Sequence, residues 1–131
     1  MNLVSLATML CVRDVARSTA WYRDKLGFEV VKDEAPDVSL LRVDSGFIYL
    51  FAESEPTEDK PDEHLRPAPG GVILVLTVED CRAAYEELRE RGVEFLTPPK
   101  SPPWGGWRCF ARDPDGYLVE IEDWAVDLHR S

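Results

Sequence analysis

Residues 104–123 read WGGWRCFARDPDGYLVEIED, and this stretch decides the fold. Its centre, DPDG at 113–116, is a tight-turn sequence between two segments that are rich in β-formers. Because strand residues alternate between faces, Glu120 and Glu122 lie on the same face of the second predicted strand. The stretch therefore predicts two strands and poses a question about Glu120, which could be a metal ligand, a catalytic base or one acid in a binding pocket.

The same order of elements occurs twice along the chain. Each half begins with an apolar strand and an amphipathic helix, and three short strands follow. The predicted elements are 3–12, 13–28, 28–33, 37–44 and 46–54 in the first half, and 71–78, 79–92, 93–99, 107–113 and 117–123 in the second. This predicts an α+β fold of two tandem βαβββ modules, with helices on the outer face of a curved mixed sheet that forms a cleft.

The two modules are predicted at 1–55 and 72–125, within a single domain that covers residues 1–131. Residues 52–71, which join them, are rich in Pro, Glu and Asp and lack periodicity, so we expect an exposed linker. His64 lies in this linker and His129 near the C-terminus, where a histidine is more often solvated than functional.

The helices have one apolar face each and end at glycine. Apolar or small side chains recur at helical spacing, and Gly27 and Gly92 follow as helix stops. The predicted buried positions are Val15, Thr19, Tyr22 and Leu26 in the first helix, and Cys81, Ala84, Tyr85 and Leu88 in the second.

The charge balance limits the possible partners. The chain has 15 Lys and Arg against 25 Asp and Glu, a formal net charge of -10. Nucleic acids and anionic membranes need a basic face, so we expect neither as a partner. The acidic balance serves solubility, or attracts a cationic ligand if the acids line a cleft.

Cysteine usage and the N-terminus indicate the cytoplasm. The three cysteines, Cys11, Cys81 and Cys109, show no zinc spacing and are expected to be buried free thiols. The N-terminal residues show neither a signal peptide nor a membrane-spanning run.

Strand alternation divides the predicted sheet into two unlike faces. In 47–51, Ile48 and Leu50 oppose Phe47, Tyr49 and Phe51. The aliphatic face is expected to pack beneath the helices. The other face carries the aromatics, Met9 and the two glutamates, a mixture that indicates either a ligand cleft or a partly hydrated sheet face.

The repeated modules, together with VRDVARSTAWYRDKLGFEV at 12–30 and RDPDGYLVEIED at 112–123, resemble the vicinal oxygen chelate superfamily. That superfamily contains glyoxalase I, extradiol dioxygenases, and fosfomycin and bleomycin resistance proteins. The resemblance covers nearly the whole chain apart from the linker.

The resemblance implies four inward positions that usually hold metal-ligating His or Glu, and here these are Ala7, Tyr49, Ile73 and Glu120. Ala and Ile have no donor atom, and Tyr is a poor ligand for hard divalent ions. A catalytic zinc site needs about three protein ligands. We therefore predict no cofactor; a divalent metal belongs only to an alternative in which other residues rebuild the site.

The resemblance also indicates the metal-free, bleomycin-resistance-like branch. PPWGGWRCFARDPDG is similar to a PWG…R…RDP stretch of that branch, with a one-residue difference in spacing. Members are typically acidic homodimers with an aromatic-lined groove between subunits. This implies a small aromatic or cationic molecule as ligand and a homodimer as the assembly.

The predicted ligand-binding residues are Met9, Phe47, Tyr49, Phe51, Trp104, Trp107, Arg108 and Glu120. Each tryptophan could stack on the ligand or fill a core or an interface. Arg108 could pair with Glu120 or with the ligand. Glu120 is expected to be partly desolvated, with a raised pKa, while Glu122 and Asp123 are expected nearer the rim.

Three functions remain open. The first is a metal-free protein that binds and sequesters an antibiotic-like molecule. The second is a metal-dependent isomerase, lyase or dioxygenase. The third is a metal-free isomerase or cyclase of natural-product biosynthesis, with Glu120 as the candidate catalytic acid or base. The fold alone cannot choose between them.

Overall fold

The computed structural model describes residues 1–53 and 66–124. The chain divides into two compact units, Met1–Ala68 and Pro69–Ser131. Their boundary falls inside the predicted linker; most of that linker, His64 and His129 lie outside the described residues. No helix in the described part of the chain is long and apolar enough to cross a membrane.

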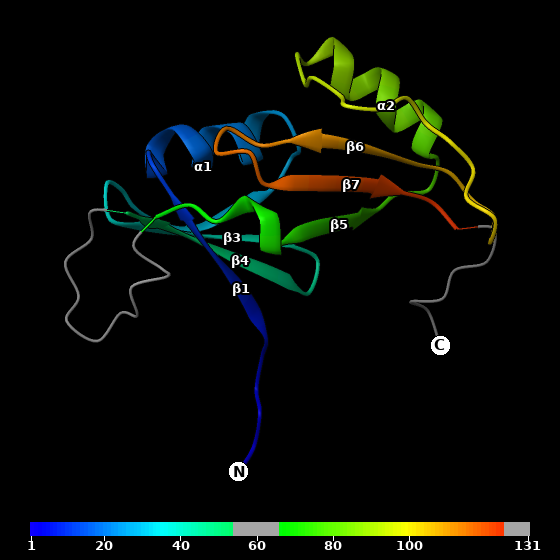
Figure 1. The fold of residues 1–131 in the computed structure, drawn as a ribbon. Helices are drawn as coiled ribbons and strands as arrows, with labels where there is room; N and C mark the ends of the chain where they lie inside the picture. Colours follow the sequence, from blue (N-terminus) through cyan, green and yellow to red (C-terminus); the bar gives the residue numbers. More distant parts are fainter. Residues whose placement is uncertain (54–65, 125–131) are drawn as a thin grey trace. The chain divides into compact units, whose positions relative to one another are not determined.

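The first unit is a mixed sheet with one helix on it. It consists of β1 (Ala7–Val12), α1 (Val15–Asp24), β2 (Glu29–Glu34), β3 (Val38–Val43) and β4 (Gly46–Ala52). The strand order is β1-β4-β3-β2, with β1 parallel to β4 and the other pairs antiparallel. In Figure 1, α1 lies along one face of this sheet.

Local signals place α1 where the sequence predicts it. The Asp14 side chain accepts a hydrogen bond from the backbone N–H of Arg17 at 3.0 Å and caps the helix. The predicted face, Val15, Thr19 and Tyr22, is buried. Gly27 then adopts φ 79°, which only glycine tolerates without strain, and the chain leaves the helix there.

The faces of the first sheet differ as predicted. Leu10, Leu41, Ile48 and Leu50 are buried on the side that α1 covers. On the other side Met9 is 44% exposed and the β4 aromatics are half-buried. The apolar core of this unit therefore lies between α1 and one face of the sheet.

The second unit is a smaller sheet of the same kind. It consists of a short 3-10 turn (Pro69–Gly71), β5 (Ile73–Thr77), α2 (Cys81–Glu90), β6 (Arg108–Arg112) and β7 (Leu118–Glu122). The order is β5-β7-β6, with β5 parallel and β6 antiparallel to β7. The helix α2 contacts β6 and β7 (Figure 1), and it buries the predicted Cys81 and Leu88.

The prediction of a strand at 93–99 is wrong, because no regular strand forms between α2 and β6. Only isolated bridges form on this edge, Phe95 to Ala111 and Lys100 to Arg108. Pro98 and Pro99 lack the backbone N–H that a ladder requires, so regular pairing cannot continue between the two bridges.

The DPDG turn forms as predicted. The Asp113 carboxylate accepts the backbone N–H groups of Asp115 and Tyr117, both at 2.9 Å. Gly116 has φ 92° and completes the turn between β6 and β7.

The register confirms that the two units are repeats. Tyr49 lies opposite Met9, the third residue of β1, and Glu120 lies opposite Val75, the third residue of β5. Tyr49 and Glu120 therefore occupy equivalent positions on the central strands. The α+β class and the arrangement in βαβββ-type modules are confirmed, with the third strand of the second module reduced to two isolated bridges. The single domain stays a prediction.

Candidate ligand site on the second unit

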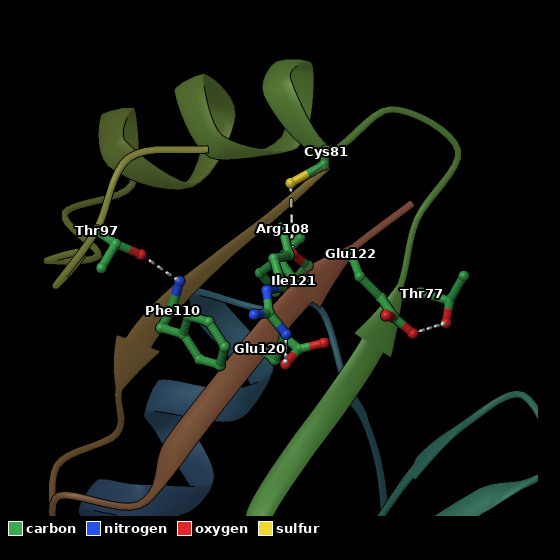
Figure 2. Close-up of polar contacts among 8 residues, drawn as sticks. All are labelled: Thr77, Cys81, Thr97, Arg108, Phe110, Glu120, Ile121 and Glu122. Carbon is green, nitrogen blue, oxygen red and sulfur yellow. Dashed lines mark hydrogen bonds and ion pairs between the residues drawn. The ribbon is translucent and has the colours of Figure 1, made fainter. Parts of the chain in front are cut away.

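Glu120 and Glu122 form a pair of carboxyl groups on the β7 face opposite the buried Val119 and Ile121 (Figure 2). The side chain of Glu120 is 12% exposed, and Glu122 is 8% exposed. The hydroxyl of Thr77 donates to Glu122 Oε1 at 3.3 Å.

The expectation that Glu122 lies near a solvated rim is therefore wrong. β7 is the central strand, and Glu122 is flanked in register by Thr77 on β5 and Arg108 on β6. Neighbours on both sides remove its carboxyl group from water.

Burial raises the pKa of Glu120, as expected. The charge of Glu122 and a hydrogen bond with its carboxyl group raise the pKa of Glu120 further, while Arg108 lowers it. A buried carboxyl group beside a second negative charge holds its proton more firmly than an isolated one does. Glu120 can thus accept or donate a proton at a less acidic pH than an exposed glutamate.

Arg108 lies beside this pair, with Nη1 4.0 Å from Glu120 Oε1. Its guanidinium carbon is 5.2 Å from the centre of the Trp104 ring and 5.4 Å from that of Phe110. The predicted Arg108–Glu120 pairing is present, but at a distance too long for a hydrogen bond. Two aromatic rings within cation–π range hold the guanidinium in place.

The two tryptophans of the WGGW segment have different surroundings. Trp104 is 63% exposed and contacts Arg108. The ring of Trp107 lies 4.5 Å from the guanidinium carbon of Arg82, a residue of α2. The structure therefore brings Trp104, and not Trp107, next to Arg108 and Glu120. Contact of either ring with a ligand stays a prediction.

Asp123 fixes the position of the WGGW segment. Its carboxylate accepts the backbone N–H of Trp107 and that of Cys81, the first residue of α2, each at 2.8 Å. A Cβ on Gly106 would lie 2.3 Å from the Asp123 carbonyl oxygen, so this close approach requires glycine. Asp123 thereby ties the segment before β6 to the start of α2.

Sequence reasoning missed two residues of this site, Phe110 and Thr77, and it placed Asp123 nearer the rim without foreseeing its two backbone contacts. Phe110 is detectable in principle, because it follows Arg108 by two positions on one strand and shares its face. Thr77 and Asp123 act through contacts with residues 45 and 42 positions away, which no local pattern reveals.

Part of the predicted site in the first unit also assembles. Tyr49 and Phe51, whose ring centres are 6.5 Å apart, line a cavity of about 240 Å³ on β2, β3 and β4. Lys32 and Glu34 form an ion pair of 3.0 Å at this cavity. The predicted residues Met9 and Phe47 do not line it.

The four family ligand positions do not fit a resident divalent metal. Ala7 and Ile73 have no donor atom, and Glu120 is already engaged by Arg108 and Glu122. Across residues 1–53 and 66–124, no group of three or more His, Cys, Asp or Glu side chains is arranged to hold a metal ion.

The chain belongs to the Glyoxalase/Bleomycin resistance protein/Dioxygenase superfamily, whose family model matches residues 5–121. The uncharacterized protein YwkD of Bacillus subtilis is 32% identical over 116 residues, which cover 82% of this chain and 87% of that protein. A lactoylglutathione lyase of Salmonella typhimurium is 32% identical over 121 residues, which cover 88% and 89% of the two chains.

Solved structures of low sequence identity share the fold. The virulence protein STM3117 of Salmonella typhimurium superposes with a TM-score of 0.72 at 24% identity, covering 95% of this chain and 100% of that one. TioX from Micromonospora sp. ML1 superposes with a TM-score of 0.74 at 19% identity, covering 92% and 98%.

Proposed function

We propose that the chain binds a small aromatic or cationic organic molecule without a catalytic metal, as antibiotic-sequestering members of its superfamily do. The observation that carries this proposal is the state of Glu120. It is the one carboxylate among the four ligand positions, and it is engaged with Arg108 and Glu122.

The aromatic side chains beside these positions support the proposal. Trp104 and Phe110 lie at Arg108 in the second unit, and Tyr49 and Phe51 line a cavity in the first. Aromatic walls with a few polar groups are typical of small-molecule sites. We do not propose the activity of the lactoylglutathione lyase relative for this chain, because Ala7 and Ile73 cannot supply ligands for a catalytic metal.

The proposal includes a homodimer with a ligand groove between its subunits, as the family resemblance implies. Sedimentation of the purified chain should give the mass of two copies. A monomer would remove the shared groove from the proposal but leave the sites on each unit.

Elemental analysis of the purified native protein tests the absence of a catalytic metal. We expect far less than one Mn, Fe, Ni or Zn per chain. We also expect tryptophan quenching by bound antibiotics to be unchanged by a chelator. One metal per chain that survives dialysis, or ligand binding that the chelator abolishes, would overturn the proposal.

A second candidate function is a metal-free isomerase or cyclase. The burial of Glu120 beside Glu122 favours it, because the raised pKa of Glu120 suits a general acid or base. Turnover that Glu120→Gln abolishes, while ligand affinity is kept, would support this enzyme. A ligand recovered unchanged after prolonged incubation would refute it.

A further inference from the structure

The guanidinium group of Arg108 has N–H donors that form no hydrogen bond within the described residues. Its single carboxylate contact is 4.0 Å long, and no hydrogen bond joins its guanidinium group to any other described residue. The side chain is 38% exposed, so water can reach these donors, and so can a ligand. A guanidinium group carries five N–H donors in a planar fork that matches the two oxygens of a carboxylate.

Two aromatic rings orient the guanidinium group of Arg108 and leave its N–H donors without hydrogen bonds to them. Trp104 and Phe110 contact the guanidinium group through their rings, a geometry that attracts the cation and forms no hydrogen bond with it. Trp104 is itself 63% exposed, which leaves ring surface free for a second planar group. Arg108 and Trp104 together present an anion-binding edge beside an open aromatic surface.

The charges next to Arg108 permit an anion. The charged groups that face Glu120 within this unit are Glu122 on β7 and Arg108 on β6. From β5 the neutral hydroxyl of Thr77 approaches the pair, at Glu122. Burial and the neighbouring Glu122 raise the pKa of Glu120, which favours its neutral form and lowers the negative charge beside Arg108. A protonated Glu120 also becomes a hydrogen-bond donor.

We propose that the ligand of this site is an aromatic carboxylate, whose carboxylate binds Arg108 and whose ring stacks on Trp104. This inference rests on the proposed function and narrows it, because it selects an acid-bearing aromatic over an organic cation. An organic cation that approached Glu120 would also approach the guanidinium group of Arg108, whose positive charge would repel it.

Two probes that share one ring and differ in charge test the inference on the full-length wild-type protein. Titration calorimetry should detect binding of 1-naphthoate and at least tenfold weaker binding of 1-naphthylmethylammonium, since charge-assisted hydrogen bonds add about that factor or more. Preference for the ammonium probe, or binding of neither, would overturn the inference.

Matched arginine variants locate the binding. Arg108→Gln should weaken 1-naphthoate binding by about tenfold or more. Arg108→Lys should recover only part of the loss, because it keeps the charge without the planar fork. Arg82→Gln is the control, since Arg82 stacks on Trp107 and has no contact with Glu120; it should change the affinity by less than about twofold. Equal losses in Arg82→Gln and Arg108→Gln would refute the assignment.

The outcomes separate this inference from the proposed function. Metal-free protein that binds the ammonium probe more tightly than 1-naphthoate would refute the carboxylate ligand and leave the metal-free binding function standing. One tightly held metal per chain would refute the binding function itself.

Discussion

Asp123→Ala should destabilise the second unit and disturb the ligand site together. The substitution removes a carboxylate that accepts two backbone hydrogen bonds of 2.8 Å, from Cys81 and Trp107. A hydrogen bond to a charged group contributes about 1.5 to 3 kcal/mol. Both bonds are only partly buried, so water replaces some of this energy. We therefore expect a loss of about 2 to 4 kcal/mol in the free energy of unfolding, a large share of the roughly 5 to 15 kcal/mol typical of a domain.

Urea denaturation followed by circular dichroism measures this loss. Asp80→Ala is the matched control, because Asp80 caps the same helix through one exposed backbone bond, to Ala83 at 3.1 Å. Loss of such a cap costs about 1 kcal/mol. Asp123→Ala should also change the fluorescence of Trp107, whereas Asp80→Ala should not. If Asp123→Ala proves no more destabilising than Asp80→Ala, the tie between the WGGW segment and α2 does not stabilise the unit.

Three further predictions concern the second unit. Gly106→Ala should lower the free energy of unfolding several-fold more than Gly116→Ala does. A Cβ at 106 would lie 2.3 Å from a backbone oxygen, whereas a Cβ at 116 would have no neighbour nearer than 3.8 Å. Equal shifts of the melting temperature in the two variants would contradict this. Burial raises the pKa of Glu120, so the folded state holds its proton more tightly and the free energy of unfolding falls as the pH rises above the ordinary glutamate range. The stability of Glu120→Gln relative to the wild type should therefore increase toward neutral pH. A stability difference that stays constant with pH would refute the raised pKa. Burial also raises the pKa of the Cys81 and Cys109 thiols, so an aromatic disulfide reagent should label them only after unfolding; rapid labelling of the native protein would contradict it.

The fold was largely predictable because its signals are local. Alternation along 47–51, helical spacing in 15–22 and the DPDG turn each depend on residues close in sequence, and the structure confirms all three. Leu26, also predicted on the buried helix face, lies beyond the end of α1 and is only half-buried. The strand expected at 93–99 failed on a local rule that periodicity overlooked. Two consecutive prolines end backbone pairing whatever the side-chain pattern.

The site was only partly predictable because its chemistry depends on long-range partners. The raised pKa of Glu120 and its pairing with Arg108 followed from burial and strand register. Placing Glu122 near the rim failed, because its burial depends on which strands flank β7, a property of sheet order. The separate surroundings of Trp104 and Trp107 depend on Asp123 and α2, which no spacing within WGGW reveals.

The position of Arg108 adds a second reason against a metal at Glu120, beyond the lack of donor atoms at Ala7 and Ile73. A divalent ion bound to Glu120 would lie within roughly 6 Å of the guanidinium group. At an effective dielectric of about 20, the repulsion is on the order of 5 kcal/mol. Other residues that rebuilt a metal site at Glu120 would have to offset this repulsion or displace Arg108 from the Trp104 and Phe110 rings. The same positive charge that opposes a metal attracts a carboxylate. The lack of donor atoms at Ala7 and Ile73 and the positive charge of Arg108 thus both argue against a bound metal cation, and the charge of Arg108 argues for the organic anion proposed above.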